Sequence, residues 1–217
     1  LYWVHDPIDA AIPTKSLLAP AYIQERARII QGSVSAAPFP GLPPGIAHYP
    51  HALPQQGREQ GTTQVSIVDA AGDLASYTAS VETVFGSRHL LAGMVMNNQL
   101  TDFSFRPTLQ GKPIANRRLP GRRPASSMAP TMVFRNGEPI LALGSPGGRT
   151  IPHVLSRVLL ASLIWKETPA RSVALPLRSK RGNTLVLEKD PPIPWMIPVD
   201  QLKSPDQPLR FERLGSG

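Results

Sequence analysis

The chain has 217 residues, enough to bury a hydrophobic core, and its hydrophobic content of 41% and charged content of 18% exclude disorder throughout. It has no cysteine, which excludes disulfides, cysteine nucleophiles and thiolate metal sites. Its five histidines lack the spacing of metal ligands, so we expect no metal. No apolar run is long enough to predict a membrane span. The formal net charge of +8 favours anionic partners, and 25 prolines predict few long helices.

The first 61 residues combine one short helix with a long irregular segment. Apolar residues recur at helical spacing over residues 20–30, where Pro20 is tolerated in the first turn. Residues 32–61 are rich in Pro, Gly, Ala, Ser and Gln, a composition that forbids regular structure, and we interpret them as a mobile linker. Because the sequence begins without a methionine or a leader, we expect it to be part of a longer protein.

Beyond Gly61 the chain predicts two β-hairpins. Residues 62–69 alternate as a strand, residues 70–73 form a turn, and residues 74–84 return as a second strand. The other hairpin pairs residues 131–135 with residues 139–143 across an Asn-Gly turn.

One convincing long helix follows the second hairpin, from Pro152 to about Lys166, with an apolar face that includes Leu155 and Val158. The region after Thr184 predicts one short strand and then a proline-rich stretch. Hairpins followed by helices favour a layered α+β domain.

Positive charge is concentrated between Phe103 and Arg123, which contains no acidic residue. The cations are Arg106, Lys112, Arg117, Arg118, Arg122 and Arg123. A nucleic-acid surface is one interpretation, but the stretch has no recognised binding motif and few aromatic residues for stacking. We favour a solvated loop that also attracts small anionic substrates, and we expect no nucleic-acid partner.

Four motifs occur in a fixed order. They are Gly61-Thr62-Thr63, residues 97–104 (NNQLTDFS), residues 123–130 (RPASSMAP) and residues 144–148 (GSPGG). Together they resemble the gamma-glutamyltransferase family, most clearly from Thr62 to Thr168, and more faintly upstream from Asp6 to Ile30. The resemblance implies a four-layer αββα sandwich of the N-terminal-nucleophile type. It also divides the chain into residues 1–61, the end of a large-subunit-like segment with its linker, and residues 62–217, a catalytic small-subunit-like domain that we expect to be truncated at its C-terminus.

Thr62 is the expected nucleophile. An internal threonine has no base beside its hydroxyl, but cleavage after Gly61 would give Thr62 an α-amino group with a pKa of about 7.7–8.0, which can accept the hydroxyl proton. The resemblance implies that the chain makes this cut itself, between Gly61 and Thr62. It also aligns Ser80 with a hydroxyl that hydrogen-bonds the nucleophile.

The other expected site residues surround a γ-glutamyl donor. Gly147 and Gly148 suit an oxyanion hole, because glycines let backbone amides approach a reacting carbonyl. The resemblance implies that Ser126 and Ser127 hold the donor's α-carboxylate. The resemblance likewise implies that the donor's α-ammonium contacts Gln99, Asp102 and Glu82. Glu82 occupies a position that is often Asn in the family.

The predicted function is transfer of a γ-glutamyl group from a glutathione-like donor to water or amino acids, without a cofactor. The partners are that donor and the remainder of the large subunit, with a periplasmic or secreted location implied by the resemblance. Two alternatives stay open. One is a glutaryl-cephalosporin-type amide acylase of the same fold, and the other is a catalytically silent protein that binds anions.

Overall fold

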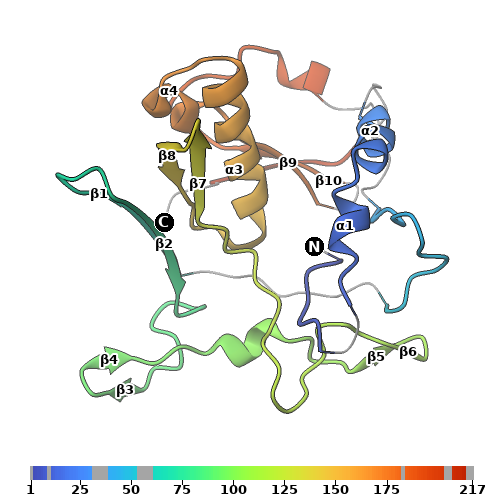
Figure 1. The fold of residues 1–217 in the computed structure, drawn as a ribbon. Helices are drawn as coiled ribbons and strands as arrows, with labels where there is room; N and C mark the ends of the chain where they lie inside the picture. The colour runs from blue at the N-terminus through green and yellow to red at the C-terminus, as the bar shows by residue number, and fades with distance from the viewer. Residues whose placement is uncertain are drawn as a thin grey trace. The chain divides into compact units, whose positions relative to one another are not determined.

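The computed structural model of the chain (Figure 1) describes residues 2–8, 11–30, 39–52, 61–181, 184–202 and 207–213. Two compact units make up the chain. Unit 1 comprises Leu1–Gly57 and Gln99–Ser126, and unit 2 comprises Arg58–Asn98 and Ser127–Gly217. The predicted boundary before Thr62 concerns chain cleavage and stays a prediction.

Unit 1 consists of short elements joined by irregular segments. They are the helices α1 (Thr14–Leu17) and α2 (Pro20–Arg28), the 3₁₀ helix η1 (Gln99–Asp102), and the antiparallel strands β5 (Thr108–Leu109) and β6 (Lys112–Pro113). Helix α2 confirms the helix predicted from Pro20, which occupies the first turn, where a backbone N–H has no partner in any case. It ends two residues before Ile30.

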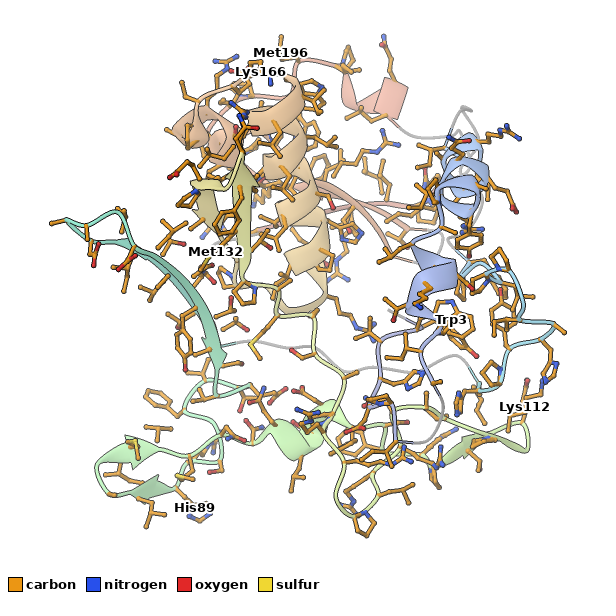
Figure 2. The ribbon with its side chains drawn as sticks, viewed as in Figure 1. Trp3, His89, Lys112, Met132, Lys166 and Met196 are labelled. Carbon is orange, nitrogen blue, oxygen red and sulfur yellow. The ribbon has the colours of Figure 1, made fainter. Side chains whose placement is uncertain are left out.

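Aromatic side chains pack the N-terminal residues of unit 1 against residues 39–52. The Tyr2 ring lies edge-on to Tyr49, with centroids 5.2 Å apart, and its hydroxyl donates to the His51 carbonyl at 2.8 Å. Trp3, labelled in Figure 2, donates from its indole N–H to the Gly41 carbonyl at 3.1 Å. The described part of the predicted linker is therefore irregular, as its prolines require, but packed; residues 32–38 and 53–60 lie outside the described residues.

The basic segment of unit 1, residues 103–125, combines exposed cations with a buried backbone. Lys112 lies exposed at the β5–β6 hairpin (Figure 2), and Arg106 and Arg118 are also exposed. In contrast, Ile114 is 1% exposed, and the carbonyl of its neighbour Pro113 accepts from the Ala52 N–H at 3.0 Å. The prediction of a solvated loop is therefore wrong for the backbone, because the apolar residues between the cations form part of the unit's core.

Three antiparallel hairpins begin unit 2. Their strands are β1 (Thr62–Val68) with β2 (Leu74–Ser80), β3 (Leu90–Leu91) with β4 (Met94–Val95), and β7 (Thr131–Arg135) with β8 (Glu138–Leu143). The two long hairpins confirm the sequence-based prediction. Strand β2 ends at Ser80 and not at Val84, because Glu82 adopts a positive φ angle of 76°, which a strand cannot accommodate.

The main core of unit 2 lies between β7–β8 and helix α3 (Ile151–Leu159), which stand side by side in Figure 1. Leu155 and Val158, from the predicted apolar face, pack with Ile151 and Leu143. The 3₁₀ turn η2 (Gly148–Thr150) precedes α3, and a π-helical turn, η3 (Leu160–Ile164), follows it, so the predicted helix is present with a change of pitch.

The remaining elements form a small sheet. Helix α4 (Pro169–Ala174) leads into β9 (Arg178–Arg181) and β10 (Thr184–Glu188), and the 3₁₀ helix η4 (Val199–Leu202) precedes β11 (Leu209–Glu212). The strand order is β11-β10-β9, with β11 parallel and β9 antiparallel to β10. Of these three strands only β10 was predicted, as the short strand after Thr184. Among the described helices, none has the length and apolar character needed to cross a membrane.

Candidate active site

Thr62 begins strand β1 directly opposite Ser80, the last residue of β2. The Thr62 hydroxyl lies 3.5 Å from Ser80 Oγ, a long hydrogen bond, and the same Ser80 oxygen accepts from the Glu82 N–H at 2.9 Å. Antiparallel pairing thus brings together three of the predicted site residues, with Ser80 fixed by its bond to the turn that follows it.

Glycine is the residue that the position before Thr62 requires. Gly61 has φ of +109°, a conformation that L side chains rarely adopt. A Cβ at this position would lie 3.1 Å from the Glu82 carbonyl oxygen and 3.2 Å from that of Thr83. The backbone at the predicted cleavage site therefore lies against the turn that carries Glu82.

Glu82 is strained and buried. Its φ of 76° is left-handed, which costs about 1–3 kcal/mol for a residue with a side chain. The residue is 5% exposed, and Oε2 is buried without a hydrogen-bond partner among the described residues. A buried carboxyl oxygen favours a cationic or hydrogen-bonding partner.

Asn98 holds the turn around Glu82 in place. Its Oδ1 accepts from the Thr83 N–H at 3.1 Å and from the Thr83 hydroxyl at 3.0 Å. Its own N–H donates to the Val81 carbonyl at 3.3 Å. Sequence reasoning placed Asn98 inside a motif but assigned it no role.

Gly147 and Gly148 connect strand β8 to helix α3. Gly147 has φ of +116°, and a Cβ there would lie 2.6 Å from Thr150 Oγ1; Gly148 also has a positive φ, of 53°. The φ and the close Thr150 contact therefore favour glycine at position 147, and the oxyanion-hole role of the two residues stays a prediction. The described residues show no hydrogen bond between these glycines and Thr62.

A polar bridge ties the nucleophile's hairpin to the glycine segment. Gln64, two residues after Thr62, donates to Ser76 Oγ at 3.1 Å, and Ser76 donates to the Leu143 carbonyl at 2.9 Å. A Cβ on Gly144 would collide with the Gln64 side chain. Strand β1 and the start of the 144–148 segment are thus in direct contact.

Gln99 and Asp102 lie at the two ends of the 3₁₀ helix η1 in unit 1. Residues three apart eclipse each other in a 3₁₀ helix, so the Gln99 amide donates to Asp102 Oδ2 at 3.2 Å. Ser126 is exposed, and Ser127 is 5% exposed. Gln99, Asp102 and Ser126 belong to unit 1, whereas the other seven predicted site residues, Gly61 included, belong to unit 2.

Unit 2 also has a cavity of about 580 Å³ bordered by residues 143–146, α3 and β10. None of the predicted site residues lines it. Arg157 on α3 and Glu188 on β10 form an ion pair there, with Nη1 and Oε2 3.7 Å apart. Burial lowers the pKa of Arg157, and the Glu188 carboxylate opposes that shift. The pair connects two elements of the fold and has no place in the predicted chemistry.

Comparison with known proteins gives one family. A family model described as Gamma-glutamyltranspeptidase matches residues 2–201. The glutathione hydrolase proenzyme of Bacillus subtilis is 38% identical over 163 residues, which make up 71% of this chain and 27% of that relative. The chain therefore spans about a quarter of that curated relative's length.

Solved structures agree with this match. A gamma-glutamyltranspeptidase from Pseudomonas nitroreducens is similar with a TM-score of 0.61 and 29% identity, covering 70% of this chain and 83% of that one. A cephalosporin acylase from Bacillus halodurans gives a TM-score of 0.70 over 92% of this chain and 32% of its own, at 23% identity. The mixed α/β fold is therefore shared with both kinds of enzyme.

Proposed function

Because the chain belongs to the gamma-glutamyltranspeptidase family, we propose that it carries the catalytic part of an enzyme that transfers γ-glutamyl groups through Thr62. The observation that supports this most is the geometry at the start of β1. Gly61 takes a conformation reserved for glycine, and the hydroxyl of the next residue lies beside Ser80.

Maturation precedes catalysis in this proposal. The Thr62 hydroxyl oxygen attacks the Gly61 carbonyl carbon, and the peptide bond gives way to an ester with release of the Thr62 amine. Water then hydrolyses the ester, which leaves a carboxylate on Gly61 and a free α-amino group on Thr62. That amine is the base that Thr62 lacked as an internal residue of the uncut chain.

Acyl transfer follows the same chemistry on a donor. The Thr62 amine accepts the hydroxyl proton while Oγ1 attacks the donor's γ-carbonyl carbon, and the Gly147 and Gly148 amides stabilise the oxyanion. The bond to the leaving amine breaks as that amine takes a proton, and an acyl-enzyme remains. Water or the amine of an amino acid then releases the glutamyl group. Ser80 orients the Thr62 hydroxyl throughout.

The donor's charged groups set specificity in this proposal. Ser126 and Ser127 donate hydrogen bonds to its α-carboxylate, and Glu82 and Asp102 face its α-ammonium, with Gln99 as a neutral neighbour. A desolvated ammonium between carboxylates forms strong, charge-assisted hydrogen bonds. Glutathione is the donor that the names of the relatives favour.

The finer fold and location are also part of the proposal. We assign the whole protein a four-layer αββα sandwich with a maturation boundary between residues 61 and 62, and a periplasmic or secreted location. The likeness to the cephalosporin acylase structure over most of the chain supports the sandwich. The same likeness, with an acid at position 82, keeps a glutaryl amide acylase as the second candidate.

Chromogenic donors separate the candidates. The protein, purified from its own host at its natural length, is assayed with γ-glutamyl and glutaryl p-nitroanilides, which differ only in the α-ammonium. We expect a higher kcat/KM for the γ-glutamyl donor. A preference for glutaryl establishes the acylase, and turnover of neither donor leaves the silent anion-binding protein.

A further inference from the structure

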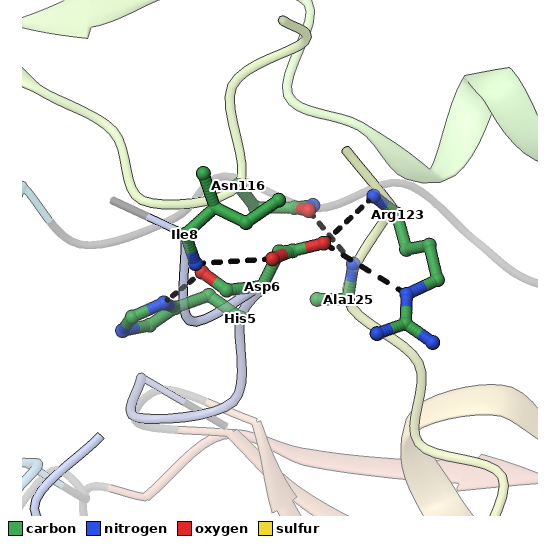
Figure 3. Close-up of polar contacts among 6 residues, drawn as sticks. All are labelled: His5, Asp6, Ile8, Asn116, Arg123 and Ala125. Atoms are coloured by element: carbon green, nitrogen blue, oxygen red, sulfur yellow. Dashed lines mark hydrogen bonds and ion pairs between the residues drawn. The ribbon is translucent and has the colours of Figure 1, made fainter. Parts of the chain in front are cut away.

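Asn116 connects the two ends of the basic segment of unit 1. Its side-chain Nδ2 donates to the Asp102 carbonyl at 2.7 Å, and its Oδ1 accepts from the Ala125 N–H at 2.8 Å. Its backbone carbonyl accepts from the Ser104 N–H at 2.8 Å. Figure 3 shows the contact with Ala125. The side-chain amide of Asn116 thus bridges the backbones of residues 102 and 125, which are far apart along the loop.

The chemistry of these partners fixes how the Asn116 amide is oriented. A backbone carbonyl can only accept and a backbone N–H can only donate, so neither contact tolerates an exchange of oxygen and nitrogen. The residue is 4% exposed, and water cannot readily replace either bond. Asn116 therefore holds its two partners at one spacing.

A second buried side chain fixes the same loop. Asp6 Oδ2 accepts from the Arg123 N–H at 3.0 Å, and its Oδ1 accepts from the Ile8 N–H at 3.1 Å (Figure 3). These backbone hydrogen bonds, Arg123 first, hold the pKa of Asp6 below its ordinary value. The Arg123 guanidinium contributes little, because its side chain is 87% exposed and its Nε is 3.9 Å away.

We propose that Asn116 is a positioning residue for donor recognition, because it sets the spacing between Asp102 and Ser126. This inference rests on the proposed function, in which Asp102 faces the ammonium and Ser126 holds the carboxylate of one α-carbon. A donor that contacts both residues at once binds well only if their spacing matches that of its ammonium and carboxylate. In the opposite enantiomer the ammonium is displaced, so its binding depends differently on the same spacing.

The isosteric variant Asn116→Asp tests this spacing. It keeps an acceptor for the Ala125 N–H but puts a carboxylate oxygen against the Asp102 carbonyl, where two acceptors repel. The measured quantity is the ratio of kcat/KM for L-γ-glutamyl to that for D-γ-glutamyl p-nitroanilide. We expect Asn116→Asp to lower this ratio about tenfold, mainly through KM for the L donor, while cleavage before Thr62 stays complete.

Tyr2→Phe is the matched control. It removes two buried hydrogen bonds within unit 1, from the Tyr2 hydroxyl to the His51 carbonyl and from the His51 N–H to that hydroxyl. It leaves the Asp102–Asn116–Ala125 connection intact, so the L-to-D ratio stays at the wild-type value. A general loss of stability lowers kcat/KM for both donors by the same factor, so it leaves their ratio unchanged.

Each outcome decides a separate point. A wild type that turns over no γ-glutamyl donor refutes the proposed function itself. A wild type that is active but shows no L preference, or an Asn116→Asp variant that keeps the wild-type ratio, overturns the positioning role alone. If Asn116→Asp does not fold, Asn116→Ser, whose side chain is polar but too short to connect both partners, is expected to lower the ratio. Failure of both variants to fold makes Asn116 purely structural.

Discussion

Glu82 shows how a single residue can carry a functional signal in both its backbone and its side chain. Its left-handed φ is held by Asn98 and by the Ser80 hydroxyl, which accepts from its N–H. The side chain that this backbone directs inward has a buried oxygen without a partner among the described residues. Backbone strain and a buried carboxyl oxygen without a partner at one position are costs that stability alone does not explain.

Replacement of Glu82 by Gln tests its proposed contact with the donor ammonium. Removing one partner of a desolvated charge pair costs on the order of 2–5 kcal/mol, so KM for γ-glutamyl donors is expected to rise by tens of fold or more. KM for glutaryl donors, which lack the ammonium, is expected to change little. Steady-state kinetics with the two anilides measures both.

Folding of the same variant provides the control. Gln removes a buried charge at nearly constant volume, so the free energy of unfolding is expected to stay constant or to increase. An equal loss on both donors, or a clear fall in stability, would show that Glu82 supports folding or chemistry and does not bind the ammonium.

At the scale of elements, a largely buried ion pair connects helix α3 to strand β10 of the C-terminal sheet. Arg157 pairs with Glu188 and also donates to the carbonyls of Val173, at 3.1 Å, and Leu175. The side chains of the pair are only 14% and 16% exposed. We expect Arg157→Gln to lower the free energy of unfolding by about 2–3 kcal/mol, because it leaves two carbonyls without their donor and leaves Glu188 Oε2 with only the Leu177 N–H as a partner.

An exposed ion pair of the same unit provides the comparison. Arg171 lies 2.9 Å from Glu167, but the two side chains are 52% and 31% exposed. Arg171→Gln is therefore expected to cost less than about 0.5 kcal/mol. Chemical denaturation of both variants measures the difference, and equal losses would contradict the role given to burial.

Acidification is expected to loosen the packing of residues 2–8 on residues 39–52. Burial lowers the pKa of His51, and the nearby His5 and Arg117 add to the shift. Well above pH 6.5 both the folded and the unfolded forms of His51 are neutral. As the pH falls below 6.5 the unfolded form gains a proton first, so stability is lost from there down to the folded pKa.

Amide exchange of residues 2–8 between pH 7.5 and about 5.5 measures this loss, after correction for the intrinsic pH dependence of exchange. His51→Gln, which does not titrate, is expected to flatten the pH profile. The Asp6 carboxylate does not interfere, because its contribution is lost as the pH falls through its ordinary pKa of 3.8 and below. An unchanged profile in the variant assigns the effect to another group.

Regular periodicity made several of these elements predictable from sequence. Alternation of residue types predicted β1, the Asn-Gly turn predicted the β7–β8 hairpin, and the apolar face predicted α3. Local geometry did not: nothing in the sequence marks the positive φ of Glu82 that ends β2 early. Strands β9 and β11 carry charged or mixed residues and were missed, because their pairing with β10 is decided by tertiary contact.

The candidate site was predictable to the extent that its residues lie within motifs. Thr62 and Ser80 are 18 residues apart, and the register of a simple hairpin brings them together. Asn116 lies among cations with no local pattern. Its role depends on contacts with residues 14 positions before it and 9 after it, which no local pattern in one sequence specifies.

At the scale of the whole molecule, unit 1 contains chain from both sides of the predicted cleavage site. Leu1–Gly57 precedes the site and Gln99–Ser126 follows it. Within the unit, Asp6 binds the Arg123 N–H and the Ala52 N–H binds the Pro113 carbonyl. Cleavage after Gly61 is therefore expected to leave two polypeptides that stay associated without a covalent link.

Mass spectrometry of the purified protein, at its natural length, tests the central claim most directly. Under denaturing conditions the wild type is expected to give two polypeptides, one of which begins at Thr62, and under native conditions a single complex of both. Thr62→Ala is expected to give one uncut chain without transferase activity, because the same hydroxyl performs both steps. A wild type that stays uncut, or a Thr62→Ala variant that is still split before residue 62, would contradict the account.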